Sequence, residues 1–334
     1  MATIKDVARL AKVSTSTVSH VINKTRFVSP EITLRVEQVV KELNYAPSAL
    51  ARSLKVNATR TLGMLVTSSA NPFFAEVVQG VEQRCFEHGY SLALCNTRGD
   101  QARLHHNMEM LLQKRVDGII LMCTQLEIDR QLLAPYPNVP LVLADWGTNH
   151  LQADLIQDCG KLGGQQATEH LIRLGHTEIG CITGPAGQRA ADERLLGFRY
   201  AMQQAGLTIN PDWLVAGDFE LTGGNTAMST LLAQPKRPSA VFISNDMMAV
   251  GALRALADAN IKVPEQMSLV GYDNIELAHY LVPALTTVEQ PKAGLGALAV
   301  ETLLSRIRSP ERAPQVLTLT PELIIRDSSQ RFTP

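Results

Sequence analysis

Aromatic, carboxylate, guanidinium and amide side chains follow several short apolar segments of this 334-residue chain. Such segments are typical of buried β-strands, and side chains that follow parallel strands can converge at one edge of a sheet. A polyhydroxylated ring needs this set, because its C–H faces stack on aromatic rings and its hydroxyl groups pair with charged or amide groups. The candidate ligand-binding residues are Asn71, Phe73, Phe74, Asp145, Trp146, Arg194, Phe219, Asn245, Asp273 and Gln290.

Each of these residues also has an ordinary structural explanation. Asn71 precedes a proline, as in many turns, while Phe73 and Phe74 could belong to a hydrophobic core. Asn245 and Asp273 could cap helices. Single positions therefore leave both interpretations open, and only their joint occurrence favours a ligand cleft.

The sequence offers no catalytic motif to explain the same residues. Residues 294–299 (GLGALA) match a dinucleotide fingerprint by letter, but they lie at an expected helix start rather than after a strand. Close helix packing through small residues fits this context better. His105 and His106 are adjacent, so they cannot share one helical face as paired metal ligands would. Because phosphate-loop, metalloprotease and nucleophile-elbow motifs are missing as well, we expect a binding protein without catalytic residues, metal or cofactor.

The elements that position the ligand candidates begin near Thr61. From there, strand-length apolar segments alternate with amphipathic helical stretches, and the alternation restarts after about Leu155. Short apolar strands joined by helices predict parallel sheets covered on both faces. Residues 58–334 are therefore expected to form two α/β lobes with a ligand cleft between them. The sequence does not predict the strand order.

Residues 1–47 carry a different pattern. Apolar residues recur at i, i+3, i+4 and i+7 over 4–11, which predicts a short amphipathic helix. Ser14 can cap a second helix over 15–23, and a third helix is expected to begin at Ser29-Pro30. Two short helices joined by a tight turn form the helix-turn-helix pattern, whose second helix enters the DNA major groove. An ordinary three-helix bundle is the alternative.

Charge supports the nucleic-acid interpretation. Residues 1–60 contain ten Lys and Arg against four Asp and Glu, a net charge of +6, whereas the remaining residues contain 21 against 28, a net charge of −7. A basic end on an acidic body indicates a nucleic-acid module joined to another domain. Because the basic side chains neutralise phosphates, binding is expected to depend strongly on salt.

Two segments resemble the LacI/GalR family of bacterial repressors, namely DVARLAKVSTSTVSHVIN at 6–23 and ELNYAPSALARSL at 42–54. The resemblance implies that Thr15, Ser16 and His20 read base edges. It also implies a homodimer on palindromic operator DNA, because two identical helix-turn-helix units require two-fold symmetric DNA. The other candidate DNA contacts are Thr3, Ser14, Thr17, Ser19, Asn23, Arg26, Arg52, Leu54 and Lys55. Of these, Thr17, Ser19 and Asn23 are expected either to contact phosphates or to support the helices.

Residues 48–57 are expected to link the two domains. A helix of this length is marginal in water, and a plain tether is the alternative. In the resembling family this segment is a hinge helix that becomes ordered on operator DNA. The resemblance implies that Leu54 enters the minor groove and kinks the duplex.

The resemblance covers essentially the whole chain and extends to periplasmic sugar-binding proteins in the body. The segments NPFF at 71–74 and GYDN at 271–274 fall where those proteins hold their sugar. Three further segments, LIQD at 155–158, CITGP at 181–185 and DNIELA at 273–278, are similar to ribose-responsive family members. The resemblance therefore implies that D-ribose is the effector and releases a repressor of a ribose operon from its DNA.

Purine-responsive members of the family are the alternative. They share QKRVDG at 113–118, PALTT at 283–287 and QPK at 290–292. In those members an arginine after the GP loop helps to read the purine, and hypoxanthine or guanine acts as corepressor. The matching position here is Gln188, but the neighbouring Arg189 would restore the arginine if the alignment slipped by one residue.

Cysteine usage and hydropathy indicate a cytoplasmic location, here in association with the nucleoid. The cysteines are odd in number and lack C-x-x-C spacing, which favours buried thiols in a reducing compartment. No apolar run approaches the length of a membrane span, and the N-terminus lacks the apolar core of a signal peptide. No membrane partner is therefore expected.

Overall fold

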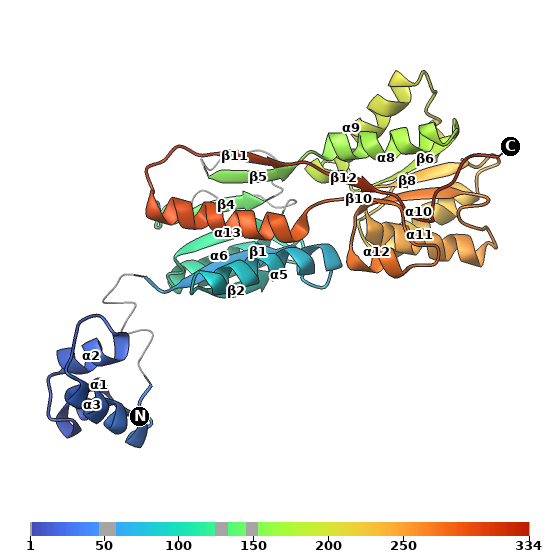
Figure 1. Cartoon of the computed structure of the whole chain (residues 1–334). Coiled ribbons are helices and arrows are strands. Elements are labelled where there is room, and N and C mark those ends of the chain that lie inside the picture. Colours follow the sequence, from blue (N-terminus) through green and yellow to red (C-terminus); the bar gives the residue numbers. More distant parts are fainter. Residues whose placement is uncertain (1, 47–57, 124–132, 145–152, 334) are drawn as a thin grey trace. The chain divides into compact units, whose positions relative to one another are not determined.

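The structure is a computed structural model that describes residues 2–46, 58–123, 133–144 and 153–333. These residues form two compact units, Met1–Arg60 and Thr61–Pro334 (Figure 1). The predicted hinge helix, with Arg52, Leu54 and Lys55, lies outside the described residues.

The N-terminal unit contains the predicted helix-turn-helix. Its helices in the described residues are α1 (Ile4–Leu10), α2 (Thr15–Asn23) and α3 (Pro30–Glu42). Ser14 caps α2 as predicted, since its Oγ accepts a hydrogen bond of 3.0 Å from the Thr17 N–H. Pro30 takes the first position of α3, but the preceding Ser29 side chain makes no capping bond. Val7, Val18 and Val36 are fully buried in a small common core.

The body contains two sheets, each with six strands in the described residues. The first has the order β11-β5-β4-β3-β1-β2, and the second has the order β12-β10-β9-β8-β6-β7. The strands of the first sheet are β1 (Thr61–Val66), β2 (Ser91–Asn96), β3 (Gly118–Met122), β4 (Leu141–Ala144), β5 (Asp154–Asp158) and β11 (Val316–Leu319). The strands of the second sheet are β6 (Ile179–Thr183), β7 (Leu214–Ala216), β8 (Ala240–Ile243), β9 (Ser268–Asp273), β10 (Thr287–Glu289) and β12 (Glu322–Ile324).

Helices cover both faces of each sheet, as the apolar strands require. In the first lobe, Met64 faces the core under α5 and α13, whereas the next residue, Leu65, faces the core under α6. The first-lobe helices are α5 (Pro72–Glu87), α6 (Gln101–Gln113) and α13 (Lys292–Arg308). The second-lobe helices are α8 (Gly160–Arg173), α9 (Arg189–Gln204), α10 (Leu221–Leu232), α11 (Asp246–Asp258) and α12 (Glu276–Tyr280), with the short 3-10 helix η1 (Pro211–Trp213) before β7.

The chain crosses between the lobes more often than the sequence pattern indicated. It passes from β5 to α8, returns from β10 to α13 and crosses again between β11 and β12 (Figure 1). Helix α13 therefore packs on the first lobe, beside α5, although it follows the second lobe in sequence. The strand pairs are parallel as predicted, except that β12 runs antiparallel to β10.

The GLGALA segment lies inside α13 and packs closely against α5. A Cβ atom on Gly296 would lie 2.4 Å from the Val77 carbonyl oxygen, and one on Gly80 would lie 2.6 Å from the Ala293 carbonyl oxygen. Only glycine permits so close an approach of two helix backbones. The predicted role in helix packing is confirmed for Gly296, whereas Gly294 makes only an ordinary contact.

A buried carboxylate fastens the end of α13 to the first sheet. Asp154 in β5 is fully buried and receives hydrogen bonds from Arg306 at 3.0 Å, from Arg312 at 2.6 Å and from the Gln315 N–H at 2.9 Å. Burial alone would raise the pKa of Asp154, but these hydrogen bonds outweigh it and lower the pKa. The carboxylate therefore stays charged and joins β5, α13 and the approach to β11.

We predict that Asp154→Ala lowers the free energy of unfolding by about 3–5 kcal/mol, because it leaves two guanidinium groups without their buried partner. Urea denaturation followed by circular dichroism measures the change. Asp258→Ala is the control, since Asp258 pairs with Arg254 on an exposed helix face and should alter stability by at most about 1 kcal/mol. Equal effects of the two substitutions would contradict the assigned role.

Candidate functional site

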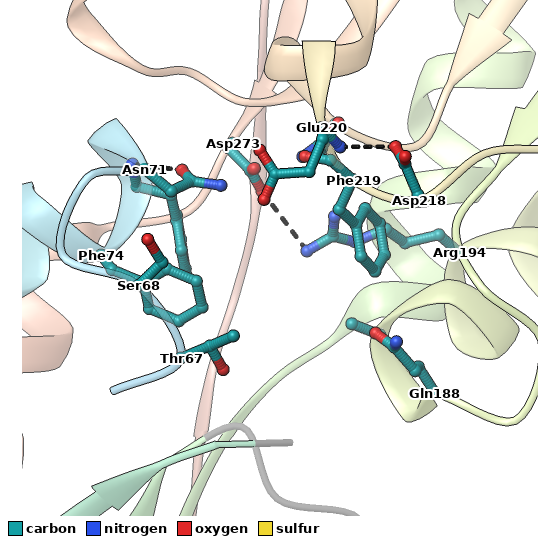
Figure 2. Close-up of a pocket in the computed structure, with 13 residues that line it drawn as sticks. Thr67, Ser68, Asn71, Phe74, Gln188, Arg194, Asp218, Phe219, Glu220 and Asp273 are labelled. Carbon is teal, nitrogen blue, oxygen red and sulfur yellow. Dashed lines mark hydrogen bonds and ion pairs between the residues drawn. The ribbon is translucent and has the colours of Figure 1, made fainter. Parts of the chain in front are cut away.

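A pocket between the two lobes gathers most of the predicted ligand residues (Figure 2). The residues of its first wall lie between β1 and the start of α5. The residues of its second wall lie after the ends of β7, β8 and β9 and around the start of α9. The predicted residues that line it are Asn71, Phe73, Phe74, Arg194, Phe219, Asn245 and Asp273. Asp145 and Trp146 lie outside the described residues.

Asn71 begins α5 and shapes the first wall. Its Oδ1 accepts a hydrogen bond of 3.0 Å from the Phe73 N–H, which caps the helix. The rings of Phe73 and Phe74 meet edge to face with their centroids 5.4 Å apart. Figure 2 shows Asn71 and Phe74 on one side, opposite Arg194 and Asp273. Asn71 therefore lines the pocket and also caps α5, whereas the sequence suggested a turn as its structural role.

Asn245 likewise caps a helix and lines the second wall of the pocket. Its Oδ1 accepts from the Met248 N–H at 2.9 Å, and its Nδ2 donates to the Phe219 carbonyl at 2.9 Å. Phe219 has a positive φ of 69°, a conformation that non-glycine residues rarely adopt. Asn245 thus caps α11 and also holds the backbone that presents the Phe219 ring to the pocket.

Arg194 is the buried cation of the site, with 4% of its surface exposed. Its guanidinium carbon lies 3.7 Å from the centroid of the Tyr272 ring, and Nη1 donates to the Ser244 carbonyl at 2.5 Å. Nη2 lies 3.4 Å from Asp273 Oδ1 and 4.0 Å from Asp158 Oδ2. A buried charge requires such partners, and they fix the direction in which the guanidinium faces.

Asp273 ends β9 and places a carboxylate beside Arg194. Burial raises the pKa of the Asp273 carboxyl to about 6, although the positive charges of Arg194 and Lys292 act in the opposite direction. Gln290 Nε2 donates to Asp273 Oδ1 at 2.9 Å. Within the described residues Gln290 is not part of the pocket lining, and its expected contact with the ligand stays a prediction. It supports Asp273 from behind.

A second buried carboxylate, Asp246, lies behind Asp273 and was not predicted as a site residue. Its Oδ1 interacts with the Thr287 hydroxyl at 2.7 Å, and its Oδ2 accepts from the Ile275 N–H at 3.0 Å. Burial and the nearby negative charge of Asp273 raise the pKa of Asp246 to about 8. Asp246 acts on the backbone after Asp273 rather than on the pocket itself.

Several further residues line the pocket without being among the candidate ligand-binding residues, although they lie in the same loops after strands. Asp218 and Glu220 come after β7, and the Asp218 Oδ1 accepts a 2.8 Å hydrogen bond from the Glu220 N–H. Thr67 and Ser68 come directly after β1, while Gln188 and Ala190 surround the start of α9. Extending each predicted site by a few residues around its loop would have found them.

The surface of α2 offers the exposed hydroxyl groups of Thr15 and Ser16. His20 is half-buried, and its Nδ1 lies 2.8 Å from the Thr25 hydroxyl. This contact fixes the imidazole against the turn that follows the helix. Thr15 and Ser16 lie at the exposed N-terminal end of α2, which is the part of a recognition helix that contacts base edges. The base contacts expected of Thr15, Ser16 and His20 stay predictions.

Other predicted DNA contacts support the helices themselves. Thr3 caps α1 through a reciprocal pair of bonds with Asp6, in which the Thr3 N–H donates to Asp6 Oδ2 at 3.0 Å. Asn23 Nδ2 donates to the Ser19 carbonyl at 2.9 Å. The support role that the sequence left open for Ser19 and Asn23 is therefore present, and Arg26 is exposed beyond the end of α2.

Within the described parts of the chain, no helix is long and apolar enough to cross a membrane. The same residues contain no cluster of three or more His, Cys, Asp or Glu side chains that could hold a metal ion. All five cysteines are free; Cys85, Cys123 and Cys181 are buried, and Cys95 and Cys159 are half-buried.

Comparison with known proteins matches both units. Residues 3–48 match the family described as bacterial regulatory proteins, lacI family, and residues 168–329 match the periplasmic binding protein-like domain. The chain is 56% identical to the ribose operon repressor of Escherichia coli K12 over 98% of this chain and 100% of that protein. It is 51% identical to the HTH-type transcriptional repressor PurR of Aliivibrio fischeri over 98% of each chain.

A solved structure shows the same arrangement of elements. The Lac repressor dimer, bound to operator and the anti-inducer ONPF, is 28% identical with a TM-score of 0.87, over 98% of this chain and 99% of that one. The helix-turn-helix, the two parallel sheets and the full-length sequence similarity agree with one another. The chain therefore belongs to the lacI family of bacterial regulatory proteins.

Proposed function

We propose that this protein is a transcriptional repressor of a ribose operon that binds palindromic operator DNA as a homodimer and is released by D-ribose. The observation that carries the ligand assignment is the buried Arg194–Asp273 pair, which faces Phe74 across the pocket. The full-length similarity to a ribose operon repressor supports it. Such a repressor acts in the cytoplasm, at the nucleoid.

The pocket chemistry suits a small sugar. A guanidinium donates hydrogen bonds and a carboxylate accepts them, so Arg194 and Asp273 together satisfy hydroxyl groups, which do both. The rings of Phe74 and Phe219 come from opposite walls of the pocket and offer apolar faces to the C–H groups of the ring. A sugar bound here contacts both lobes at once.

Contact with both lobes provides the route to regulation. A ligand between two lobes favours the arrangement in which both walls reach it, which is a hinge-type transition. Ligand binding can release DNA only if the ligand binds the DNA-incompetent arrangement more tightly than the other. We propose that ribose does so, and that the change reaches the DNA through residues 48–57.

A purine corepressor is the second candidate, because the chain is also 51% identical to a repressor named PurR. Gln188 and Ala190 line the pocket at the start of α9. Arg189, the residue that would favour a purine, is not part of the pocket lining in the described residues. This placement favours the sugar.

Calorimetric titration of the full-length protein tests the ligand assignment. We expect heat from D-ribose and none from hypoxanthine or ribose 5-phosphate. Asp273→Ala should weaken ribose binding by about 100-fold, because a hydrogen bond to a charged group is lost. Asp212→Ala, at an exposed position of the same lobe, is the matched control and should bind normally. Hypoxanthine binding without ribose binding would overturn the sugar assignment.

Ribose affinity should also depend on pH through Asp273. Because sugar hydroxyls donate to the ionised carboxylate, binding lowers a pKa that stands at about 6 in the free protein. Affinity is therefore full above about pH 6, and Kd should rise by up to about tenfold per pH unit below it. Titrations across this range measure the slope. Asp273→Asn should bind more weakly and lose the slope, and an unchanged slope in that variant would assign the titration to another group.

A further inference from the structure

The backbone that carries Asp273 is held in an unfavourable conformation. Asp273 has a φ of 107° and Asn274 a φ of 49°, so two consecutive non-glycine residues occupy positive φ. Such conformations persist only where the surroundings impose them. Residues 273–276, which we call the ligand loop, must therefore be fixed by contacts that outweigh this strain.

The second lobe supplies part of that restraint. Asp246 accepts from the Ile275 N–H at 3.0 Å. Arg326 Nη2 donates to the Asn274 Oδ1 at 2.7 Å, and the Thr287 hydroxyl accepts from the Asn274 N–H at 3.4 Å. These contacts hold Asn274 and Ile275 but not the carbonyl groups of the two strained residues.

The first lobe supplies the remaining contacts. Lys292, the first residue of α13, donates from Nζ to the Asp273 carbonyl at 2.7 Å and to the Asn274 carbonyl at 2.6 Å. Glu76 on α5 accepts from the Glu276 N–H through Oε1 at 3.0 Å. Its other oxygen, Oε2, lies 3.4 Å from Lys292 Nζ. One ion pair in the first lobe thus binds three backbone groups of a loop in the second.

The placement of Lys292 is unfavourable without these contacts. The N-terminal end of a helix carries partial positive charge, which repels a cation. Only 5% of the Lys292 surface is exposed, and a buried ammonium group is costly unless it is paired and hydrogen-bonded. Helix formation and solubility therefore do not explain a lysine here, whereas its hydrogen bonds to the ligand loop do.

Lys292 and Glu76 lie on two helices, α13 and α5, that pack closely against each other. Helices α5 and α13 touch where Gly80 meets Ala293 and where Gly296 meets Val77, within about one to two turns of Glu76 and Lys292. Such close backbone contact leaves little room for one helix to move without the other. Lys292 and Glu76 therefore keep a fixed spacing while they hold the loop.

We propose that Lys292 and Glu76 form a clamp by which the first lobe fixes the ligand loop, so that both are positioning residues for the Asp273 carboxylate. This inference rests on the proposed function in treating Asp273 as a ligand-binding residue. The side chain of Asp273 faces the pocket while its carbonyl is bound by the opposite lobe. Any shift of Asp273 on ligand binding therefore acts directly on α5 and α13.

Amide hydrogen exchange in the unliganded full-length protein tests the clamp without a ligand. We expect Lys292→Met to accelerate exchange of the Asn274, Ile275 and Glu276 amides by about tenfold, since methionine keeps the length but not the donor. Glu76→Ala should accelerate exchange at Glu276 more than Glu76→Gln, which keeps an acceptor oxygen. Lys236→Met is the control, because Lys236 pairs with Glu178 at an exposed site, and it should leave these amides unchanged.

Ribose titration of the same variants completes the test. Both Lys292→Met and Glu76→Ala should weaken ribose binding by about tenfold, while Lys236→Met should bind as the wild type does. Normal exchange in folded Glu76→Ala and Lys292→Met would overturn the clamp. If Lys292→Met fails to fold, the exchange rates of the Glu276 amide in Glu76→Ala and Glu76→Gln test the clamp instead; equal rates in these two variants would overturn it. Accelerated exchange in a protein that never binds ribose would support the clamp and reject the sugar assignment.

Discussion

The buried pairing of Arg194 with Asp273 is the interaction on which the proposed ligand site depends. Each charge is buried and needs the other. Removing one partner of a buried ion pair leaves the other charge uncompensated, which lowers the free energy of unfolding by about 3–5 kcal/mol. Arg194 is also held by the Tyr272 ring and the Ser244 carbonyl, and Asp273 by Gln290. These contacts fix both groups before a ligand arrives. Preorganised polar groups of this kind favour a ligand that can donate and accept hydrogen bonds without bringing a net charge.

The topology provides a route by which the proposed ligand site could be coupled to DNA binding. The pocket walls belong to different sheets, and the chain crosses between those sheets at β5–α8, β10–α13 and β11–β12. The second of these crossings runs from Gln290, which supports Asp273, to Lys292, which binds the Asp273 carbonyl. The segment from Gln290 to Lys292 therefore connects Asp273 to the first lobe over three residues. The first lobe follows residues 48–57 directly in the chain, and the helix-turn-helix precedes them.

Local patterns predicted much of the site. The positions of Asn71 and Asp273 near strand ends could be predicted because short apolar strands are recognisable and their ends converge in parallel sheets. The cap of Ser14 and the boundaries of α2 followed from residue type and period alone. Asn245 shows that a helix cap and a pocket residue were not true alternatives, because the first turn of a helix after a strand lies at the same sheet edge as the pocket.

The remaining features depend on contacts between distant parts of the chain. Asp246, Lys292 and Glu76 act on the ligand loop, yet Glu76 is 200 residues from the Glu276 amide that it binds. The sequence pattern gives α13 a helical period but not the lobe on which it packs. The hydrogen bond from Gln290 to Asp273 is a further feature that only the side-chain geometry shows.

A sugar bound in the pocket is expected to weaken the affinity of the protein for operator DNA. Fluorescence anisotropy of a palindromic operator duplex, selected by the full-length protein from a random library, measures this directly when titrated with and without saturating D-ribose. We expect ribose to raise the apparent Kd for the operator by about tenfold or more, at constant salt. An operator affinity that stays the same or increases while ribose is bound would contradict the account.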